Sequence, residues 1–229
     1  MDSNRKTAII VGILFITATV AYSLGVILLE PILRASDYLT MASENENTMI
    51  IGSFLVLIDA VAVAGIGIMI YPVLKKHSGS LALGYAGARI AEGVLFTINV
   101  IAILTLLALA QDLAKAGYPD TAYYQTFGTV LLAAGDLAFL FGFAVAFTIS
   151  ALILNYLLYR SKLVPRWLSG WGFIGAALLW VYYLLQPFNI YLLGILFVPI
   201  AMQEMVFAVW LIVKGFDPDA IDTEPSGTV

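Results

Sequence analysis

The chain has 229 residues, of which 62% are hydrophobic and 11% are charged, and its formal net charge at pH 7 is −4. A soluble globular domain is about 45–50% apolar and about 25% charged, so this composition indicates an integral membrane protein. The absence of cysteine excludes disulfides, thiolate metal sites and cysteine nucleophiles. A single histidine, His77, excludes a multi-histidine metal site, and the acidic balance gives no indication of nucleic-acid binding. We therefore expect neither a cofactor nor a bound metal.

Apolar stretches of about 20 residues or more recur six times and predict six transmembrane helices. We expect them at residues 7–29, 48–74, 81–111, 127–158, 167–185 and 190–213. The predicted fold is all-α, a polytopic integral membrane protein with one six-helix transmembrane domain over residues 1–214. Residues 215–229 hold four acidic residues, two prolines and two glycines, so a disordered acidic cytoplasmic tail is expected there.

Basic residues are unevenly divided between the two ends of the predicted helices. One side carries most of them: Arg5, Lys6, Lys75, Lys76, Arg160, Lys162, Arg166 and Lys214. The other side has only Arg34 and Lys115, and it includes an acidic loop at residues 30–47. Because cytoplasmic loops are enriched in Lys and Arg, both termini are expected to be cytoplasmic in a multi-pass plasma-membrane protein.

Ionisable residues interrupt the apolar stretches at five positions. They are Asp59, Arg89, Glu92, Asp136 and Glu204. A charge at the centre of a bilayer costs about 2.5–3.5 kcal/mol, so such residues pair, titrate or line a polar site. Four carboxylates face one arginine here, which favours proton or cation handling, or recognition of a cationic ligand.

The third predicted helix carries a polar stripe. Arg89 and Glu92 are three residues apart and share a face, and Asn99 continues that face seven residues later. The pair is either a structural clamp or a device in which Arg89 binds an anionic group that Glu92 orients. Glu204 follows Pro199 by five residues, and that proline is expected to kink the last helix beside the acid.

Glycine recurs every seven residues on the fourth predicted helix, at Gly128, Gly135 and Gly142. This spacing predicts a stripe where a neighbouring helix packs closely. The second and fourth helices also each carry an aspartate, Asp59 or Asp136, six residues before a glycine. The similarity is compatible with a duplicated hairpin.

Two aspartates within apolar helices also raise the hypothesis of an intramembrane aspartyl protease. Such enzymes carry a Gly-x-Gly-Asp motif, whereas this chain has Ala133-Ala134-Gly135-Asp136 and lacks the first glycine. A carboxylate dyad that shares one proton stays an open alternative.

Three segments together resemble a known family. They are Arg89-Ile90-Ala91-Glu92, the stretch from Leu163 to Gly172 (LVPRWLSGWG), and Glu204 followed by residues 208–216 (AVWLIVKGF). The sequence resembles the uncharacterised prokaryotic membrane family known as domain of unknown function 4386. Its most specific segments here are Pro165-Arg166-Trp167-Leu168 and Lys214-Gly215-Phe216. The resemblance implies a six-helix prokaryotic membrane protein and carries no activity with it.

Three functional hypotheses follow from these residues. The first is small-ligand binding or proton- or cation-linked transport, in which Arg89 and Glu92 orient a polar or cationic ligand with Asn99 nearby. Asp59, Asp136 and Glu204 would then exchange protons or coordinate the cation. The second is a non-catalytic sensor or assembly partner, with membrane lipids and further copies of the chain as partners. The third is an intramembrane enzyme that uses carboxylates, which the lack of a recognisable nucleophile disfavours.

Overall fold

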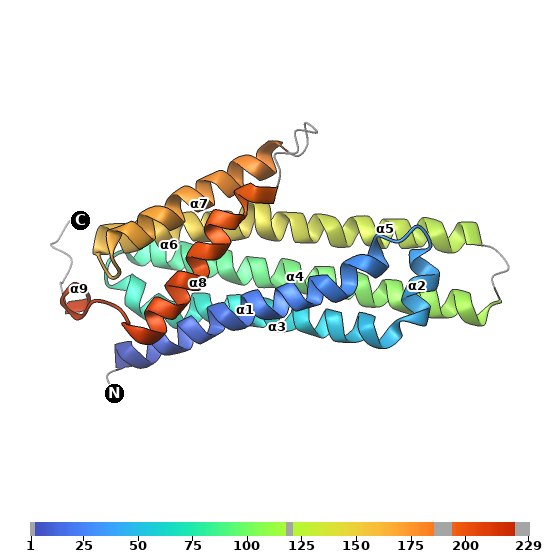
Figure 1. The fold of residues 1–229 in the computed structure, drawn as a ribbon, viewed down its shortest axis with the longest axis horizontal. Coiled ribbons are helices and arrows are strands. Elements are labelled where there is room, and N and C mark those ends of the chain that lie inside the picture. The colour runs from blue at the N-terminus through green and yellow to red at the C-terminus, as the bar shows by residue number, and fades with distance from the viewer. Residues whose placement is uncertain (1–2, 118–120, 186–193, 223–229) are drawn as a thin grey trace. The chain divides into compact units, whose positions relative to one another are not determined.

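The computed structural model of the chain describes residues 3–117, 121–185 and 194–222, and its elements are shown in Figure 1. Within these ranges helices are joined by short turns, and no residue is in a strand. The elements are α1 Ser3–Leu33, α2 Tyr38–Glu44, α3 Glu46–Lys75, α4 Gly79–Lys115, α5 Thr121–Phe141, the π-helix η1 Gly142–Phe147, α6 Thr148–Ser161, α7 Arg166–Leu185, the 3₁₀-helix η3 Gly194–Leu196, α8 Val198–Val213 and α9 Pro218–Asp222.

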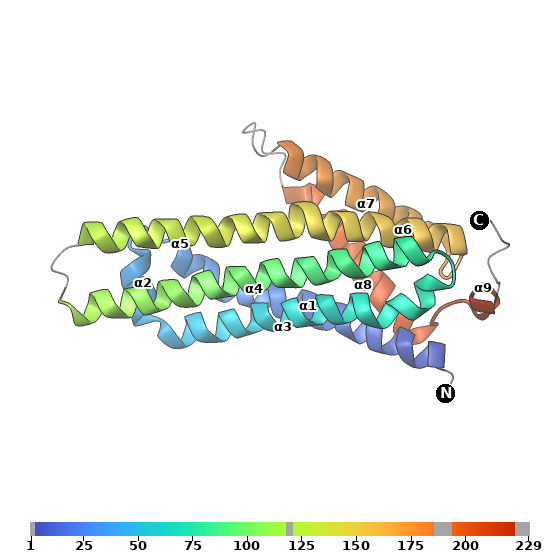
Figure 2. The ribbon, with the colours of Figure 1, turned by 180° about the vertical axis from the view of Figure 1, so that it is seen from behind.

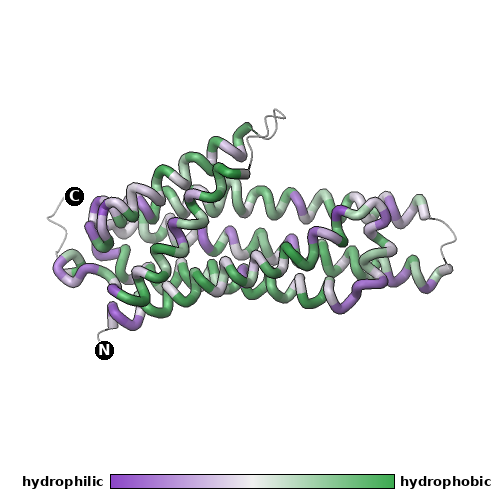
Figure 3. Tube along the Cα trace, in the orientation of Figure 1, coloured by the Kyte–Doolittle hydropathy of each residue, from purple (hydrophilic) through white to green (hydrophobic). Residues whose placement is uncertain are grey.

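Among the residues that the structure describes, five helical stretches are long and apolar enough to cross a bilayer. They are α1, α3, α4, the continuous α5–η1–α6 stretch at Thr121–Ser161, and α7. Figure 3 shows these helices as mainly hydrophobic, with hydrophilic residues at α9 and around α2. A helix can hydrogen-bond its whole backbone internally, which is why such apolar sequences fold this way in lipid.

The last expected helix is shorter than predicted. Helix α8 has 16 residues and begins at Val198, and the first residues of the expected range, 190–193, lie outside the described part of the chain. Pro199 lies at the start of α8 and not in its interior, so the expected kink beside Glu204 is wrong. A proline is favoured in the first turn of a helix because no intrahelical partner exists there for a backbone N–H.

The fourth expected helix is longer than predicted and contains a π-helical turn. Its residues run from Thr121 to Ser161, and η1 occupies Gly142–Phe147. The Thr148 hydroxyl donates a hydrogen bond to the carbonyl oxygen of Phe143 at 3.0 Å, which satisfies an acceptor at the irregular turn. Helix periodicity alone could not predict this turn, because a π-turn adds a residue without changing hydropathy.

The described residues form two compact units. Unit 1 is drawn from Met1–Ile16, Ala62–Glu92 and Phe143–Val229, and unit 2 from Thr17–Val61 and Gly93–Gly142. Each unit has its own buried apolar cluster, and the residues of α1, α3 and α4 are divided between the two.

Unit 1 is built around α6, α7 and α8, with α7 packed against both of the others. Arg5 of α1 donates hydrogen bonds to the carbonyl oxygens of Leu211 and Val213 at 2.9 and 3.2 Å, at the end of α8. Those carbonyls have no intrahelical partner, so the guanidinium caps the helix and complements its dipole.

The acidic tail differs from the expectation over its first residues. Phe216, Ala220 and Ile221 are buried in the core of unit 1, and α9 forms at Pro218–Asp222. These apolar side chains, spaced along an otherwise acidic segment, provide enough buried surface to order it. Residues 223–229 of the expected disordered tail lie outside the described part of the chain.

Unit 2 contains the second part of α1, with α2 and α5, and Figure 2 shows its α4 and α5 side by side. The glycine stripe of α5 is confirmed as a close-packing surface. An added Cβ would lie 2.6 Å from the Tyr38 hydroxyl at Gly128 and 3.2 Å from the Asn99 amide nitrogen at Gly135. The expected loop at residues 30–47 is largely helical, because α1 continues to Leu33 and α2 follows it.

Candidate functional site

The centre of unit 1 holds a buried ion pair between Arg89 and Glu92. Both residues lie on α4, three positions apart, which places them on one face of the helix. Nη1 of Arg89 donates to Oε2 of Glu92 at 2.9 Å and to Oε1 at 3.2 Å. Only 3% of the Arg89 side chain and 2% of the Glu92 side chain are exposed, so the pair is shielded from water.

A second carboxylate reaches the same guanidinium from another helix. Oε1 of Glu204 on α8 lies 3.6 Å from Nη2 of Arg89, and 18% of the Glu204 side chain is exposed. Glu204 lies more than a hundred residues after Arg89 and Glu92 in sequence, and the structure brings these three predicted residues together.

Aromatic rings flank the guanidinium of Arg89. Its Cζ atom lies 5.3 Å from the ring centroid of Phe15 and 5.5 Å from that of Phe147, within the range of cation–π attraction. On a further side, a Cβ added at Gly67 of α3 would lie 2.8 Å from Cβ of Arg89. Arg89 therefore lies among rings and a close helix backbone, where its charge is compensated mainly by the two carboxylates.

Two polar atoms of this cluster have unused hydrogen-bonding capacity. Nε of Arg89 and the hydroxyl of Tyr85 are buried, and neither has a hydrogen-bond partner among the described residues. Tyr85 precedes Arg89 by four positions on α4, one helical turn away. A buried polar atom without a partner usually marks a strained or functional position, or one where a water or ligand binds.

The cluster also has an imbalance of charge. One guanidinium faces two carboxylates, so the group carries one excess negative charge if both acids are ionised. An uncompensated charge in an apolar interior is costly, and uptake of one proton or one small cation removes the excess.

A neighbouring polar contact in unit 1 was not predicted from the sequence. Gln203, next to Glu204 on α8, donates from Nε2 to Oδ1 of Asn155 at 3.4 Å and to the carbonyl oxygen of Leu168 at 3.3 Å. Asn155 is 2% exposed, and a Cβ added at Gly172 would fall within its side chain. This network holds α8 against α6 and α7 one position from Glu204.

The remaining predicted residues belong to unit 2. Asp136 forms a bidentate ion pair with Arg34, with N–O distances of 2.8 and 2.9 Å. Asn99 donates to the carbonyl oxygen of Gly135 at 3.0 Å. Asp59 is 4% exposed and takes part in an interaction within the fold.

Sequence reasoning missed Arg34 and Glu30 as partners of Asp136. Nε of Arg34 lies 3.2 Å from Oε2 of Glu30, and about half of each side chain is exposed. The Asp136 carboxylate raises the pKa of Arg34 above its usual range. The signal was the spacing of four between Glu30 and Arg34, which indicates that α1 continues beyond its apolar stretch. These groups border a cavity of about 100 Å³ that Tyr22 and Asn99 also line.

The fold and the buried charges together define a class: an all-helical membrane protein with ionisable residues inside its helical bundle. Within that class the chain belongs to the family described as domain of unknown function DUF4386, whose model matches residues 10–215. No curated protein and no solved structure matches the chain.

Proposed function

We propose that the chain is a proton-linked binding or transport protein in which Glu204 takes up and releases a proton beside Arg89. The observation that carries this proposal is that Glu92 and Glu204 share one guanidinium in the interior of unit 1. A proton on one carboxylate removes the excess charge and needs no coordination shell, which suits a cluster packed between aromatic rings.

Glu204 is the better proton carrier of the two acids. Its oxygen is 3.6 Å from the guanidinium, whereas that of Glu92 is 2.9 Å away. Its side chain is 18% exposed, against 2% for Glu92, so a proton has a shorter route to it. Glu92 is expected to stay ionised as the permanent partner of Arg89.

The protonation state of Glu204 would change how strongly α8 is tied to α4. An ionised Glu204 attracts Arg89 across the two helices, and a protonated one releases most of that attraction. Two states that differ in this way can couple proton binding to the movement of a helix, and thereby to a ligand. The ligand would be a small polar or cationic molecule, since a cation can replace the proton in compensating the excess charge.

We also propose six membrane spans, with α8 as the sixth, and both termini in the cytoplasm of a cell bounded by a plasma membrane. The basic residues around α1, α3, α6, α7 and α8 support this orientation. The chain has no cysteine, so a single cysteine can be introduced at Ser3 in one variant and at Ser43 in another. Each variant is then treated with a thiol reagent in intact cells. Reagent that does not cross the membrane should label position 43 only.

The central experiment measures carboxyl protonation in the purified protein by infrared difference spectroscopy as the pH is lowered in lipid vesicles. The native chain should show a carboxylic acid signal that Glu204→Gln removes. Glu44→Gln, which alters an exposed acid on α2, should leave the signal unchanged. A signal that persists in Glu204→Gln, or none in the native protein, would contradict the proposal.

One observation favours a second candidate, a membrane sensor or assembly scaffold. The Arg89–Glu92 pair is almost completely buried and already well bonded, as expected of a structural clamp. In that case Glu204→Gln would lower thermal stability. Neither this variant nor the native protein would then take up protons or small cations into vesicles in response to pH.

A further inference from the structure

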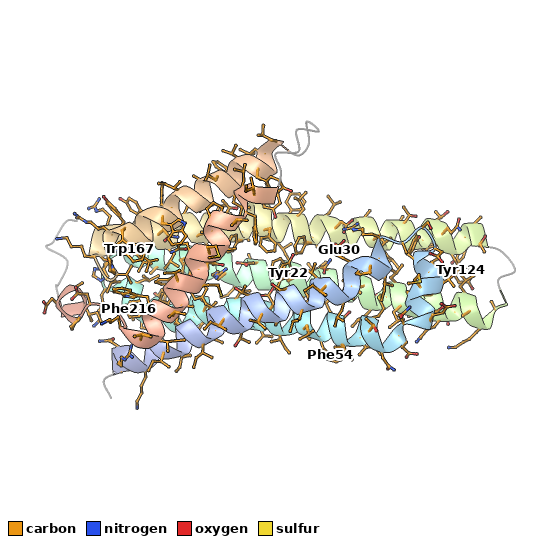
Figure 4. The ribbon with its side chains drawn as sticks, viewed as in Figure 1. Tyr22, Glu30, Phe54, Tyr124, Trp167 and Phe216 are labelled. Carbon is orange, nitrogen blue, oxygen red and sulfur yellow. The ribbon has the colours of Figure 1, made fainter. Side chains whose placement is uncertain are left out.

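A cavity of about 640 Å³ opens in unit 1 where the α6–α7 connection meets the end of α8. Its lining brings together the Pro165–Arg166 and Lys214–Gly215–Phe216 segments, which are about 50 residues apart in sequence. Figure 4 shows Trp167 and Phe216 at this end of unit 1, close to α9. The cavity is distinct from the Arg89 cluster, and the proposed proton function does not use it.

The charges around this cavity are mixed, with a positive balance. Lys162, Arg166 and Lys214 contribute three positive charges, and Asp217 and Asp219 contribute two negative ones, which leaves one positive charge in excess. Among the described residues, neither Lys162 nor Lys214 forms an ion pair.

One of the two acids of the cavity, Asp217, is engaged within its own turn. Oδ1 of Asp217 accepts a hydrogen bond from the backbone N–H of Asp219 at 3.0 Å. The backbone N–H of Asp217 in turn donates to the carbonyl oxygen of Leu163 at 2.9 Å, which fixes this turn against the α6–α7 connection. The Asp217 carboxylate is therefore engaged within this turn, whereas Lys162 and Lys214 are not held by an ion pair among the described residues.

The start of α7 adds positive potential to the same place. This helix begins at Arg166 and runs for 20 residues, and its first backbone N–H groups have no intrahelical acceptor. Pro165 has no N–H, and its carbonyl oxygen accepts a hydrogen bond from the backbone N–H of Leu168 at 3.0 Å. The first backbone N–H groups of the helix are therefore those of Arg166 and Trp167. Helix N-termini combined with basic side chains favour phosphate groups.

The position of the cavity along the helices points to a lipid and not to a soluble anion. It lies where the apolar α6, α7 and α8 end, and Trp210 contributes to its lining. Trp210 packs edge-to-face against Trp167 at 6.4 Å, and Trp167 is 56% exposed. Tryptophan is enriched at membrane–water interfaces, which is also the depth of lipid phosphates.

We propose that this cavity binds the headgroup of an anionic phospholipid, with the phosphodiester held by Lys162, Arg166 and Lys214. A phosphodiester carries one negative charge, which balances the excess positive charge of the lining. Basic pockets between transmembrane helices on the cytoplasmic side are suited to lipid headgroups. The acyl chains would lie along the apolar sides of α7 and α8.

The test is native mass spectrometry of the full-length protein in detergent, titrated with phosphatidylglycerol. The double variant Lys162→Asn/Lys214→Gln removes two of the three cations, and asparagine tolerates the left-handed backbone of position 162, where φ is 59°. We expect affinity to fall about 25-fold, because each of the two basic residues contributes about a fivefold factor near an anionic lipid. Helical content by circular dichroism should match that of the native protein.

Two controls separate this site from general attraction and from free phosphate. Lys75→Gln/Lys76→Gln removes two basic residues that do not line the cavity and should bind the lipid as the native protein does. Diacylglycerol with the same chains should bind weakly, and glycerol phosphate should compete poorly. Equal loss in both double variants, or glycerol phosphate binding as well as the lipid, would overturn the proposal.

Discussion

Units 1 and 2 each contain an arginine that contacts two carboxylates, and the two clusters are built in the same way. In each, one glutamate lies three or four positions before or after the arginine in the chain, and the second acid comes from a distant helix. They differ in solvent exposure. The Arg89 side chain is 3% exposed, whereas the Arg34 side chain is 53% exposed.

This difference changes what the same three groups can do. Around Arg34, solvent screens the excess negative charge, so the ion pairs act as a tether of modest strength between α1 and α5. Around Arg89, the excess charge is not screened, and the proton that we propose for Glu204 would compensate it. Burial, and not the set of side chains, makes the cluster in unit 1 the candidate for function.

The largest expected effect is from Arg89→Ala. This change leaves Glu92 and Glu204 buried without a cation, and breaking a buried pair in this way costs about 3–5 kcal/mol. The free energy of unfolding, measured by denaturant titration in detergent micelles, should fall by that amount. The matched change in unit 2, Arg34→Ala, should cost less than about 1 kcal/mol because its partners are half exposed.

Replacing the whole cluster sharpens this first prediction. The triple variant Arg89→Met/Glu92→Leu/Glu204→Leu removes every charge at once and should be nearly as stable as the native chain. It should also lose all pH-dependent carboxyl signals of the cluster. If Arg89→Ala and Arg34→Ala are equally destabilising, the proposed contrast between the two clusters is wrong.

The coupling between Arg34 and Asp136 is expected to be smaller. A double-mutant cycle with Arg34→Ala and Asp136→Ala should give a coupling energy of about 0.2–1 kcal/mol, discounted for the exposure of both groups. Raising the salt concentration should reduce it, since the Debye length shortens to about 3 Å at 1 M. A coupling that is large and insensitive to salt would mean that lipid or protein shields this pair.

The smallest effect concerns pH and the exposed cluster. The pKa of Arg34 is raised by Asp136, so the pair's contribution to stability, present at neutral pH, is lost in alkali only as pH rises above that raised pKa. Native stability should therefore show no loss from this pair in alkali. In Arg34→Lys the ordinary lysine pKa is about 10.4, so the contribution should disappear as pH rises above about 10. Thermal unfolding across that range, with Lys115→Arg as a control, measures the difference.

The sequence predicted the helical class well because long apolar stretches have one main solution in lipid. It also predicted the Arg89–Glu92 pair, since residues three apart on a helix must share a face. The placement of Glu204 beside them depends on how α8 packs, and a single sequence contains no local signal for that. Hydropathy likewise placed the end of the first helix too early, because α1 continues through the polar Glu30 to Leu33, and Glu30 pairs with Arg34 just beyond that end.

Pro199 and Asp136 show why the other expectations failed. A proline kinks a helix only if the helix starts well before it. Hydropathy does not mark the start of α8, so the sequence did not show that Pro199 lies in its first turn. Asp136 was counted as a membrane charge without a partner because Arg34 had been assigned to a loop. Once α1 extends to Leu33, the two side chains form an ion pair. The number of unpaired charges that a sequence predicts therefore depends on where its helices are predicted to end.

The contact of Arg5 with the end of α8 has a consequence for the order in which the chain can assemble during synthesis. All described segments of unit 2 have been made once residue 142 has been translated. Unit 1 combines the first helix with the last, and the hydrogen bonds from Arg5 span 206 residues or more. Contacts between distant residues form late, so the Arg5 guanidinium at the start of α1 has no carbonyl to cap until the end of α8 has been made. The cluster around Arg89, which also needs Glu204, is therefore completed only in the last stage of synthesis.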